Sequence, residues 1–447
     1  MKTPEQPSTV QSSRRAFMAI AGGVAASLLP GARASEEQRE TPFLGPIIGH
    51  SDSELTIIWM RATKEATLTL EVIPEENSDD QKQTKIDGIA LPENDFCIQW
   101  RITTLKPGQR YRYRILQQQE PIADHDSQVF TVPLPSDVVC KVRLAISSCA
   151  REDAGSRLVW QRMAAESVDG VVLIGDTPYI DSTELTEQTR RHQEFAAVAE
   201  YQQLLSSRPC WWTWDDHDFA GNDSSGLAEG KENSRLVYSR YRPQKEYGDG
   251  TGGIYTSFRQ GPIEVFLLDT RWYSMTEPSF AASHKPTMLG AAQWKWLSEG
   301  LLKSTAPFKL LACGVIWDDK ENSESDDWGT YRHELTAIQR FIGTHRISGV
   351  ILVGGDIHAS RILRYPTEKT VGYNMVQLIA SPVHSSTIPS LNVYNPDLVR
   401  SAVEPNIFLR LDADSTVQPP VLEAVLINGR GEHVFSYRLT ADELKAK

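Results

Sequence analysis

The chain is long and acidic. It has 447 residues, with 46 lysines and arginines against 58 aspartates and glutamates, which gives a formal net charge of −12. This length accommodates one large α/β domain together with a smaller one, and an ample apolar core. The acidic balance argues against non-specific binding to nucleic acid, so no nucleic-acid partner is expected.

Residues 1–34 have the pattern of a twin-arginine signal peptide. Arg14 and Arg15 lie in the segment SRRAFM, a weakly hydrophobic run continues to Leu29, and residues 32–34 (ARA) fit a small-residue cleavage site. The apolar run, about 15 residues, is too short to span a bilayer, so no permanent membrane anchor is expected. We predict export through the twin-arginine machinery to the periplasm or the extracellular space.

The segment 42–135 has the pattern of short β-strands. The runs 55–59, 66–72 and 111–115 are separated by polar, proline or glycine turns. Residues 105–111 resemble the turn into a late strand of a fibronectin-type sandwich. We therefore predict a small N-terminal β-sandwich domain.

A proline-containing linker at 133–135 is predicted to lead into a catalytic domain at 138–440. In this region apolar runs alternate with helical patterns, which is typical of an α/β fold. The predicted helices are 157–166, 185–205, 291–303 and 334–344. The last two strands, 421–426 and 433–438, flank an Asn-Gly pair and predict a hairpin.

Polar side chains follow four apolar runs at the point where each run ends. They are Cys149 after 142–146, Asp176 and Tyr179 after 170–174, Asp216 after 209–214, and Asp356 and His358 after 350–355. Open α/β folds keep their ligand sites at the carboxyl ends of their strands, so we expect these side chains to form one site. Carboxylate, imidazole, thiol and phenol groups together indicate a metal centre.

The order and spacing of these residues resemble the sequence blocks of the binuclear metallophosphoesterases, with systematic substitutions. Cys149 stands where those enzymes have the His of their first block, and Ser147 replaces its Asp. Asp216 replaces an Asn, and Asp356 replaces the first His of the last block. Tyr179 matches the additional ligand of the Fe(III)-binding purple acid phosphatases.

This combination resembles the alkaline phosphatase D (PhoD) family. Further similar segments cover nearly all of the chain beyond the signal peptide, and they include 252–258, 268–273, 293–297 and 380–382. A separate His block of the metallophosphoesterases is not found, because the run 310–316 ends in Trp317. The resemblance implies an α/β metallophosphoesterase-like catalytic domain, a two-sheet αββα sandwich, with an iron and calcium centre.

The donor types favour two different ions. Cys149, Asp176, Tyr179 and His358 would offer sulfur, oxygen and nitrogen to a first ion, a mixture suited to Fe(III).

A second ion would share Asp176 as a bridge. Its other ligands would be Asp216 and Asp356, with Asn222 or Asp181 as further candidates. These are all oxygen donors, which favour Ca(II), with Mn(II) or Mg(II) as alternatives.

Three residues outside the ligand set are candidates for catalysis or substrate binding. His217 follows a proposed ligand and could donate a proton to the leaving oxygen, or it could orient Asp216. Arg271 could bind phosphate bidentately, or it could pair with Asp269 or a ligand carboxylate. His384 is a candidate for contact with the substrate or with a metal ligand.

Two features remain open. The acidic segment 321–327 is expected to be a solvated loop, with a role at the rim of the substrate site as the alternative. Cys97, Cys140, Cys210 and Cys313 lie in apolar surroundings, where free thiols and disulfides are equally compatible with the pattern.

The function predicted from these observations is hydrolysis of phosphate monoesters, diesters or both, by a water molecule that the metals activate. The partner would be a small phosphorylated substrate. A phosphodiesterase or nucleotidase specialised for one extracellular molecule is a second hypothesis. A non-catalytic surface protein that binds metal is a third.

Overall fold

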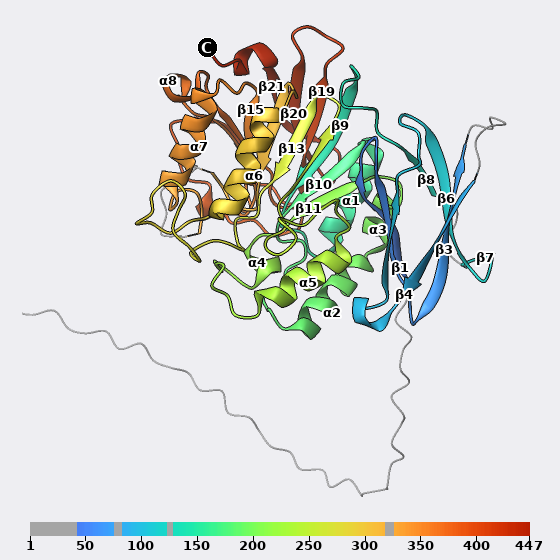
Figure 1. Ribbon diagram of the computed structural model, residues 1–447. Coiled ribbons are helices and arrows are strands. Elements are labelled where there is room, and N and C mark those ends of the chain that lie inside the picture. Colours follow the sequence, from blue (N-terminus) through green and yellow to red (C-terminus); the bar gives the residue numbers. More distant parts are fainter. Residues whose placement is uncertain (1–42, 76–82, 123–127, 318–325) are drawn as a thin grey trace, which may run out of the picture. The chain divides into compact units, whose positions relative to one another are not determined.

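A computed structural model describes residues 43–75, 83–122, 128–317 and 326–447 (Figure 1). The predicted signal peptide lies outside these residues.

Two large mixed sheets dominate the chain after residue 140. The first has six strands in the order β11-β10-β9-β19-β20-β21, and the second has seven in the order β12-β13-β14-β15-β17-β16-β18. The first sheet contains β9 (Lys141–Ser147), β10 (Gly170–Ile174), β11 (Cys210–Thr213), β19 (Ile407–Asp414), β20 (Val421–Asn428) and β21 (His433–Thr440). The second contains β12 (Thr256–Gln260), β13 (Ile263–Leu267), β14 (Phe308–Ala312), β15 (Val350–Gly354), β16 (Ser360–Arg364), β17 (Val376–Ile379) and β18 (Leu398–Ala402).

Alternating side chains of β9 show how the layers are stacked. Leu144 and Ile146 belong to a core that includes strand residues of the second sheet, such as Leu311. Ala145, which points to the opposite face, belongs to a separate core with helix residues such as Trp160. The two sheets therefore pack against each other, and helices cover their outer faces.

The helices are divided between these two outer faces, as Figure 1 shows for α1 and α3 on one side and α6 and α7 on the other. The first group comprises α1 (Ala154–Ala165), α2 (Leu185–Ala196), α3 (Ala199–Leu205) and α5 (Lys231–Tyr241). The second comprises α6 (Gly290–Lys303) and α7 (Arg332–Thr344), and two short helices are α4 (Asp216–Phe219) and α8 (Glu368–Val371). This is the two-sheet arrangement with outer helices that the sequence predicts.

One predicted helix is divided into two. The sequence pattern predicts a continuous helix over 185–205, but Val198 has extended dihedral angles, with φ −65° and ψ 114°, between α2 and α3. The other three predicted helices are present with boundaries shifted by a few residues. Local periodicity does not detect such a break, because α3 packs as a separate helix against α1 and β1 (Leu44–Ser51).

Strands before residue 132 form two smaller sheets. One has the order β1-β2-β5, and the other has the order β4-β3-β6-β7 with β8 paired to β6. Their bounds are β2 (Thr56–Arg61), β3 (Ala66–Pro74), β4 (Thr84–Ala90), β5 (Cys97–Ile102), β6 (Arg110–Gln117), β7 (Glu120–Pro121) and β8 (Gln128–Thr131). Ile58 and Met60 of one sheet share a core with Leu70 and Tyr113 of the other.

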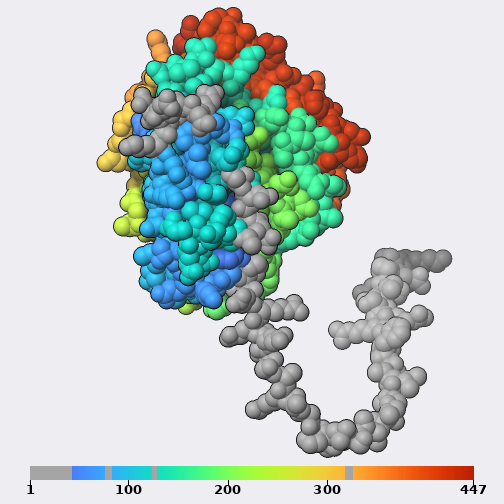
Figure 2. All heavy atoms as spheres, turned by 90° about the vertical axis from the view of Figure 1, so that its right-hand side faces the viewer, coloured from blue at the N-terminus to red at the C-terminus, as the bar shows by residue number. Residues whose placement is uncertain are grey.

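The opposite face of the three-stranded sheet contacts the helices. Trp59 of β2 donates from Nε1 to the Arg240 carbonyl at 2.7 Å, and the Gly45 N–H donates to Gln202 Oε1 at 2.9 Å. Figure 2 shows these N-terminal strands, in blue, on the face turned to the viewer, beside green segments that follow in the chain.

The structure answers the open question of the cysteines. All five are free thiols, so no disulfide forms in the structure.

The predicted C-terminal hairpin is confirmed, because β20 and β21 pair antiparallel. Within the described segments, none of the helices combines the length and the apolar character that crossing a membrane would need.

Candidate metal centre

The candidate ligands meet because their strands run parallel. β9, β10 and β11 are parallel neighbours in the first sheet, and β15 is parallel to β14 in the second. Cys149 and Asp176 follow β9 and β10, Asp216 begins α4 after β11, and His358 follows β15. Parallel strands place their carboxyl ends at the same edge, so loops far apart in the sequence converge.

Several of these loop residues have unusual backbone conformations. Cys149, Asp176, Asp356 and His358 have φ values of 58°, 53°, 65° and 50°. Residues other than glycine adopt such left-handed angles at some energetic cost, and they concentrate at functional sites.

Asp176 belongs to two groups of potential ligands. Cys149, Asp176 and His358 have ligand atoms within 4.8 Å of one another, and so do Asp176, Asp216 and His217. Asp176 is 1% exposed, and its Oδ1 has no hydrogen-bond partner among the described residues. A buried carboxylate that belongs to two sets of donors has the position of a bridging ligand.

Cys149 is fully buried at the base of the first group. Its sulfur lies 3.5 Å from Asp176 Oδ2, 3.6 Å from the Asp356 carbonyl oxygen and 3.2 Å from Ser381 Oγ. Burial and the charge of Asp176 hold the pKa of this thiol well above its usual value. A thiolate at this place therefore requires a neighbouring cation.

Carboxylates crowd the centre of the site. Burial, followed by the charges of Asp216 and Asp215, raises the pKa of Asp176 well above its usual value. Burial also raises the pKa of Asp218 to about 7. Such a concentration of buried acids, with an unpartnered oxygen on Asp176, fits the binding of cations, which would relieve the repulsion.

Tyr179 connects the first group to two histidines. Its hydroxyl lies 2.9 Å from His358 Nε2 and 3.1 Å from His384 Nε2. His384 is fully buried, and its Nδ1 accepts a hydrogen bond from the Ser386 N–H at 3.0 Å. A neutral His384 must then carry its proton on Nε2, which donates to the Tyr179 oxygen. Arg151 stacks on the Tyr179 ring, with Cζ 4.2 Å from the ring centroid.

His217 is paired with Asp181. His217 Nδ1 lies 2.5 Å from Asp181 Oδ1, and the His217 carbonyl oxygen accepts the N–H groups of Ile180 and Asp181 at 2.9 Å each. A carboxylate on Nδ1 fixes the ring orientation and leaves Nε2 for another partner. Asp181, a candidate ligand in the sequence, thus contacts His217 and belongs to neither ligand group.

Arg271 forms a buried ion pair. Its Nε and Nη2 donate to Asp215 Oδ1 at 2.7 and 2.5 Å, and Nη1 donates to Asp326 Oδ2 at 2.9 Å. Of the two roles left open by the sequence, the structure favours the ion pair over phosphate binding. Asp269, one of the two kinds of partner proposed from the sequence, accepts from Arg271 only the backbone N–H, and the ion pairs are formed with Asp215 and Asp326.

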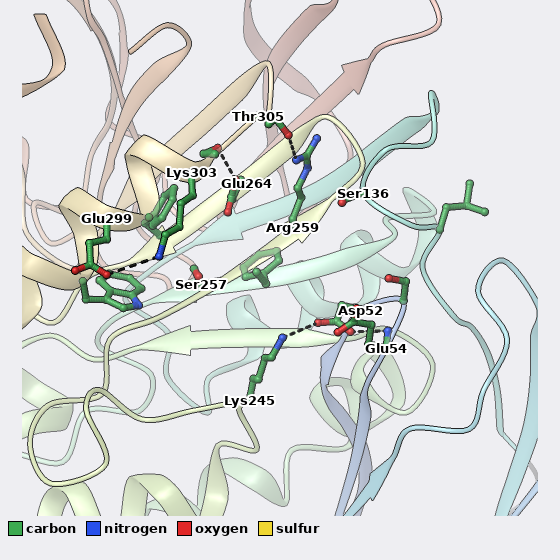
Figure 3. A pocket seen from close by; sticks show the side chains of 17 residues that line it. Asp52, Glu54, Ser136, Lys245, Ser257, Arg259, Glu264, Glu299, Lys303 and Thr305 are labelled. Atoms are coloured by element: carbon green, nitrogen blue, oxygen red, sulfur yellow. Dashed lines mark hydrogen bonds and ion pairs between the residues drawn. The ribbon is translucent and has the colours of Figure 1, made fainter. Parts of the chain in front are cut away.

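A separate hollow of about 490 Å³ lies outside this cluster and contains none of its residues. Figure 3 shows its ionic side chains directed toward one another. Lys245 pairs with Asp52 at 3.4 Å, and Lys303 pairs with Glu299 at 3.7 Å. Because both lysines pair with carboxylates of the hollow itself, the hollow offers no convergent ligand set.

The sequence model of one family decides the assignment. The model of the PhoD-like phosphatases matches residues 144–415, more than half of the chain. The chain belongs to the PhoD-like phosphatase family. The matched range contains both groups of potential ligands that share Asp176.

Similar proteins agree with this family. Alkaline phosphatase D of Bacillus subtilis (strain 168) is 24% identical over 323 residues, which are 61% of this chain and 55% of the Bacillus protein. The alignment thus spans about half the length of that relative.

Two solved structures share the fold. A structure of PhoD superposes with a TM-score of 0.75 and 19% identity, covering 92% of each chain. A purple acid phosphatase from yellow lupin (Lupinus luteus) seeds gives a TM-score of 0.66 and 12% identity, and the match covers 90% of this chain and 74% of that one.

Some sequence-based candidates of this PhoD-like protein lie outside the ligand groups. Asn222 is exposed, and its neighbour Asp223 instead forms a third group with Asp216 and Asp326. Asp356 is in none of the three groups, although its charge contributes to the raised pKa of Asp176.

Residues 321–325 of the acidic segment lie outside the described structure, and the expectation of a solvated loop is wrong for its last two residues. Asp327 is buried, and the side chain of Asp326 is only 13% exposed because it pairs with Arg271. Sequence reasoning also missed Arg151, although its position two residues after Cys149 on the same loop could have indicated it.

Proposed function

We propose that this protein is an exported hydrolase of phosphate esters that uses two bound metal ions. The observation that carries the proposal is the position of Asp176, which is shared by two groups of ligand atoms. A shared carboxylate is the expected bridge of a binuclear site, and binuclear sites stabilise both the attacking and the leaving oxygen of a phosphoryl group. Family membership supports the same reaction class.

The ligands are assigned from their donor types. The first ion is held by Cys149, Asp176, Tyr179 and His358, and the thiolate and phenolate favour Fe(III). The second ion is held by Asp176, Asp216 and Asp356, whose oxygen atoms favour Ca(II), with Mn(II) or Mg(II) as alternatives.

Two bound cations would lower the pKa of a water molecule and neutralise charge on the phosphoryl oxygens. His217 donates a proton to the leaving oxygen. This role is supported by Asp181 on Nδ1, which orients the ring and leaves Nε2 directed elsewhere. The role is also supported by the ligand atom of His217, which lies within 4.8 Å of those of Asp176 and Asp216.

Export by the twin-arginine pathway remains part of the proposal, since residues 1–34 lie outside the described structure. The substrate is a small phosphorylated molecule. The two small sheets at 42–135 are proposed to be a fibronectin-like domain, separated from the catalytic domain by the linker at 133–135.

The central test is an assay of metal-loaded mature protein with p-nitrophenyl phosphate and bis-p-nitrophenyl phosphate. Asp176→Asn should abolish hydrolysis and lower the content of both metals, because a bridging carboxylate contacts each ion. Asp442→Asn is the matched control, since Asp442 is exposed and distant from the cluster in sequence. Wild-type protein that binds metals but hydrolyses neither ester would favour a metal-binding protein instead.

Export is tested separately by replacing Arg14 and Arg15 together with Lys. The export machinery reads this arginine pair, so unprocessed precursor should accumulate in the cytoplasm. Efficient processing of the double variant would indicate another route of export.

A further inference from the structure

The phosphoryl group of the substrate is anionic, but the site is rich in carboxylates. Arg271, the cation expected to bind phosphate, is 1% exposed and its guanidinium is occupied by Asp215 and Asp326. A side chain that binds the substrate anion in addition to the metals must therefore be another cation, with donors that solvent can reach.

Arg151 is an exposed cation beside the first ligand group. It follows Cys149 by two residues on the loop after β9, and it is exposed. Its Cζ lies 4.2 Å from the centroid of the Tyr179 ring, whose hydroxyl contacts His358. A guanidinium stacked on an aromatic ring keeps its N–H groups free along its edge, where they can meet two oxygens of one phosphate.

The carboxylates nearest to Arg151 in the chain have other partners. Glu152 pairs with Arg191 at 2.9 Å. Asp153 accepts the N–H groups of Ser156 and Ser385, at 2.7 and 3.0 Å. Throughout the described segments, no hydrogen bond or ion pair involves the Arg151 guanidinium. Its positive charge is therefore available to a ligand.

We propose that Arg151 binds the non-bridging oxygens of the substrate phosphoryl group and favours monoesters over diesters. The inference rests on the proposed function. Above neutral pH a phosphate monoester carries two negative charges and a diester carries one, so a single cation attracts the monoester more strongly.

The test compares Arg151→Met and Arg151→Lys with wild type, all loaded with metal. Met keeps an apolar stem over the Tyr179 ring without charge, and Lys keeps the charge without the bidentate fork. Arg157→Met is the matched control, because Arg157 is an exposed arginine on α1, the helix that follows the loop of Arg151. The measurements are kcat and KM for both p-nitrophenyl esters, metal content, and the dissociation constant for inorganic phosphate by calorimetry.

For Arg151→Met we expect the phosphate dissociation constant and the monoester KM to rise by roughly 10- to 100-fold. The diester KM should rise less, metal content should stay the same, and Arg151→Lys should recover part of the loss. Equal phosphate dissociation constants in wild type and Arg151→Met would overturn the proposal. If wild type hydrolysed neither ester, the proposed function would fail, while the phosphate measurement would still decide the role of Arg151.

Discussion

Arg271 donates two hydrogen bonds to one oxygen of Asp215, from Nε at 2.7 Å and from Nη2 at 2.5 Å, and both side chains are only 1% exposed. Burial raises the pKa of Asp215, and the guanidinium acts against that rise. Gly314 leaves room for this carboxylate, since a Cβ at Gly314 would lie 2.3 Å from Asp215 Cγ. The pair thus holds the loop after β11 against the second sheet.

Arg271→Met should destabilise the protein strongly. Removing one partner leaves Asp215 buried without its cation, and such losses cost about 3–5 kcal/mol in the free energy of unfolding. Denaturant unfolding of the metal-free protein measures this effect. The double variant Arg271→Met/Asp215→Asn should lose less than the sum of the two single variants, because the two residues interact directly. A stable Arg271→Met enzyme with only a raised KM would instead support phosphate binding by Arg271.

Tyr179→Phe should remove the colour of the iron-loaded protein. Phenolate bound to Fe(III) gives a visible charge-transfer band, and the Tyr179 oxygen lies at the first ligand group beside His358. The absorption spectrum and the thermal melting curve check this, with Tyr394→Phe as the control because Tyr394 is 87% exposed. A colourless, fully active wild-type enzyme that contains only zinc would contradict the iron assignment.

Cys149→Ala should lower iron content and activity but leave calcium binding. Its sulfur is in the first ligand group only, and the second group consists of Asp176, Asp216 and His217. Metal analysis after dialysis measures both ions. A parallel loss of calcium would mean that the two sites do not form independently.

His217→Ala should slow the hydrolysis of esters with basic alcohol leaving groups much more than the hydrolysis of p-nitrophenyl phosphate. A poor leaving group needs a proton in the transition state, and general acids contribute about 10²–10⁴-fold. Asp181→Asn should also slow the esters with basic leaving groups more than p-nitrophenyl phosphate, but by a smaller factor, since Asp181 contacts His217 Nδ1. His284→Ala serves as the control because His284 is exposed. Equal losses on both esters, accompanied by loss of metal, would make His217 a ligand or an orienting residue.

Lys309 should make stability depend on pH in the alkaline range. Its ammonium is buried in β14 and donates to the carbonyls of Ala306 and Ser348 at 2.6 and 3.1 Å. Burial lowers its pKa from 10.5 to about 8. Between these two values the unfolded chain binds more protons than the folded chain, so stability rises with pH.

The free energy of unfolding of wild type, relative to Lys309→Met, should therefore increase by up to about 1.4 kcal/mol per pH unit from pH 8 to 10.5. The matched control is Lys303→Met, which replaces an exposed lysine. A constant difference between wild type and Lys309→Met across this range would contradict the lowered pKa.

The sequence was sufficient for the parts of the site that lie directly after strands. Asp176, Asp216 and His358 follow buried apolar runs. Parallel strands bring such positions to the same edge of a sheet, independently of the paths of the loops. Strand patterning also predicted the final hairpin, because alternating residues around Asn428 and Gly429 specify it locally.

What the sequence could not give were the partners of charged side chains. Arg271 meets Asp326 from a loop 55 positions later, and Arg151 stacks on Tyr179 from a different strand end. These pairings depend on the paths of loops, which local composition does not encode.

The sequence by itself therefore determined the family, through its motifs, and the α/β class, through its periodicity. It also predicted that Cys149, Asp176 and His358 meet at strand ends. Only the tertiary structure decided which cation is buried and which remains exposed. Arg271 and Arg151 are the same residue type, each close to a strand end, yet one is enclosed by Asp215 and Asp326 while the other has no carboxylate partner within the described part of the chain. The physical reason is that burial and pairing follow from the surrounding packing, which no local stretch of sequence contains.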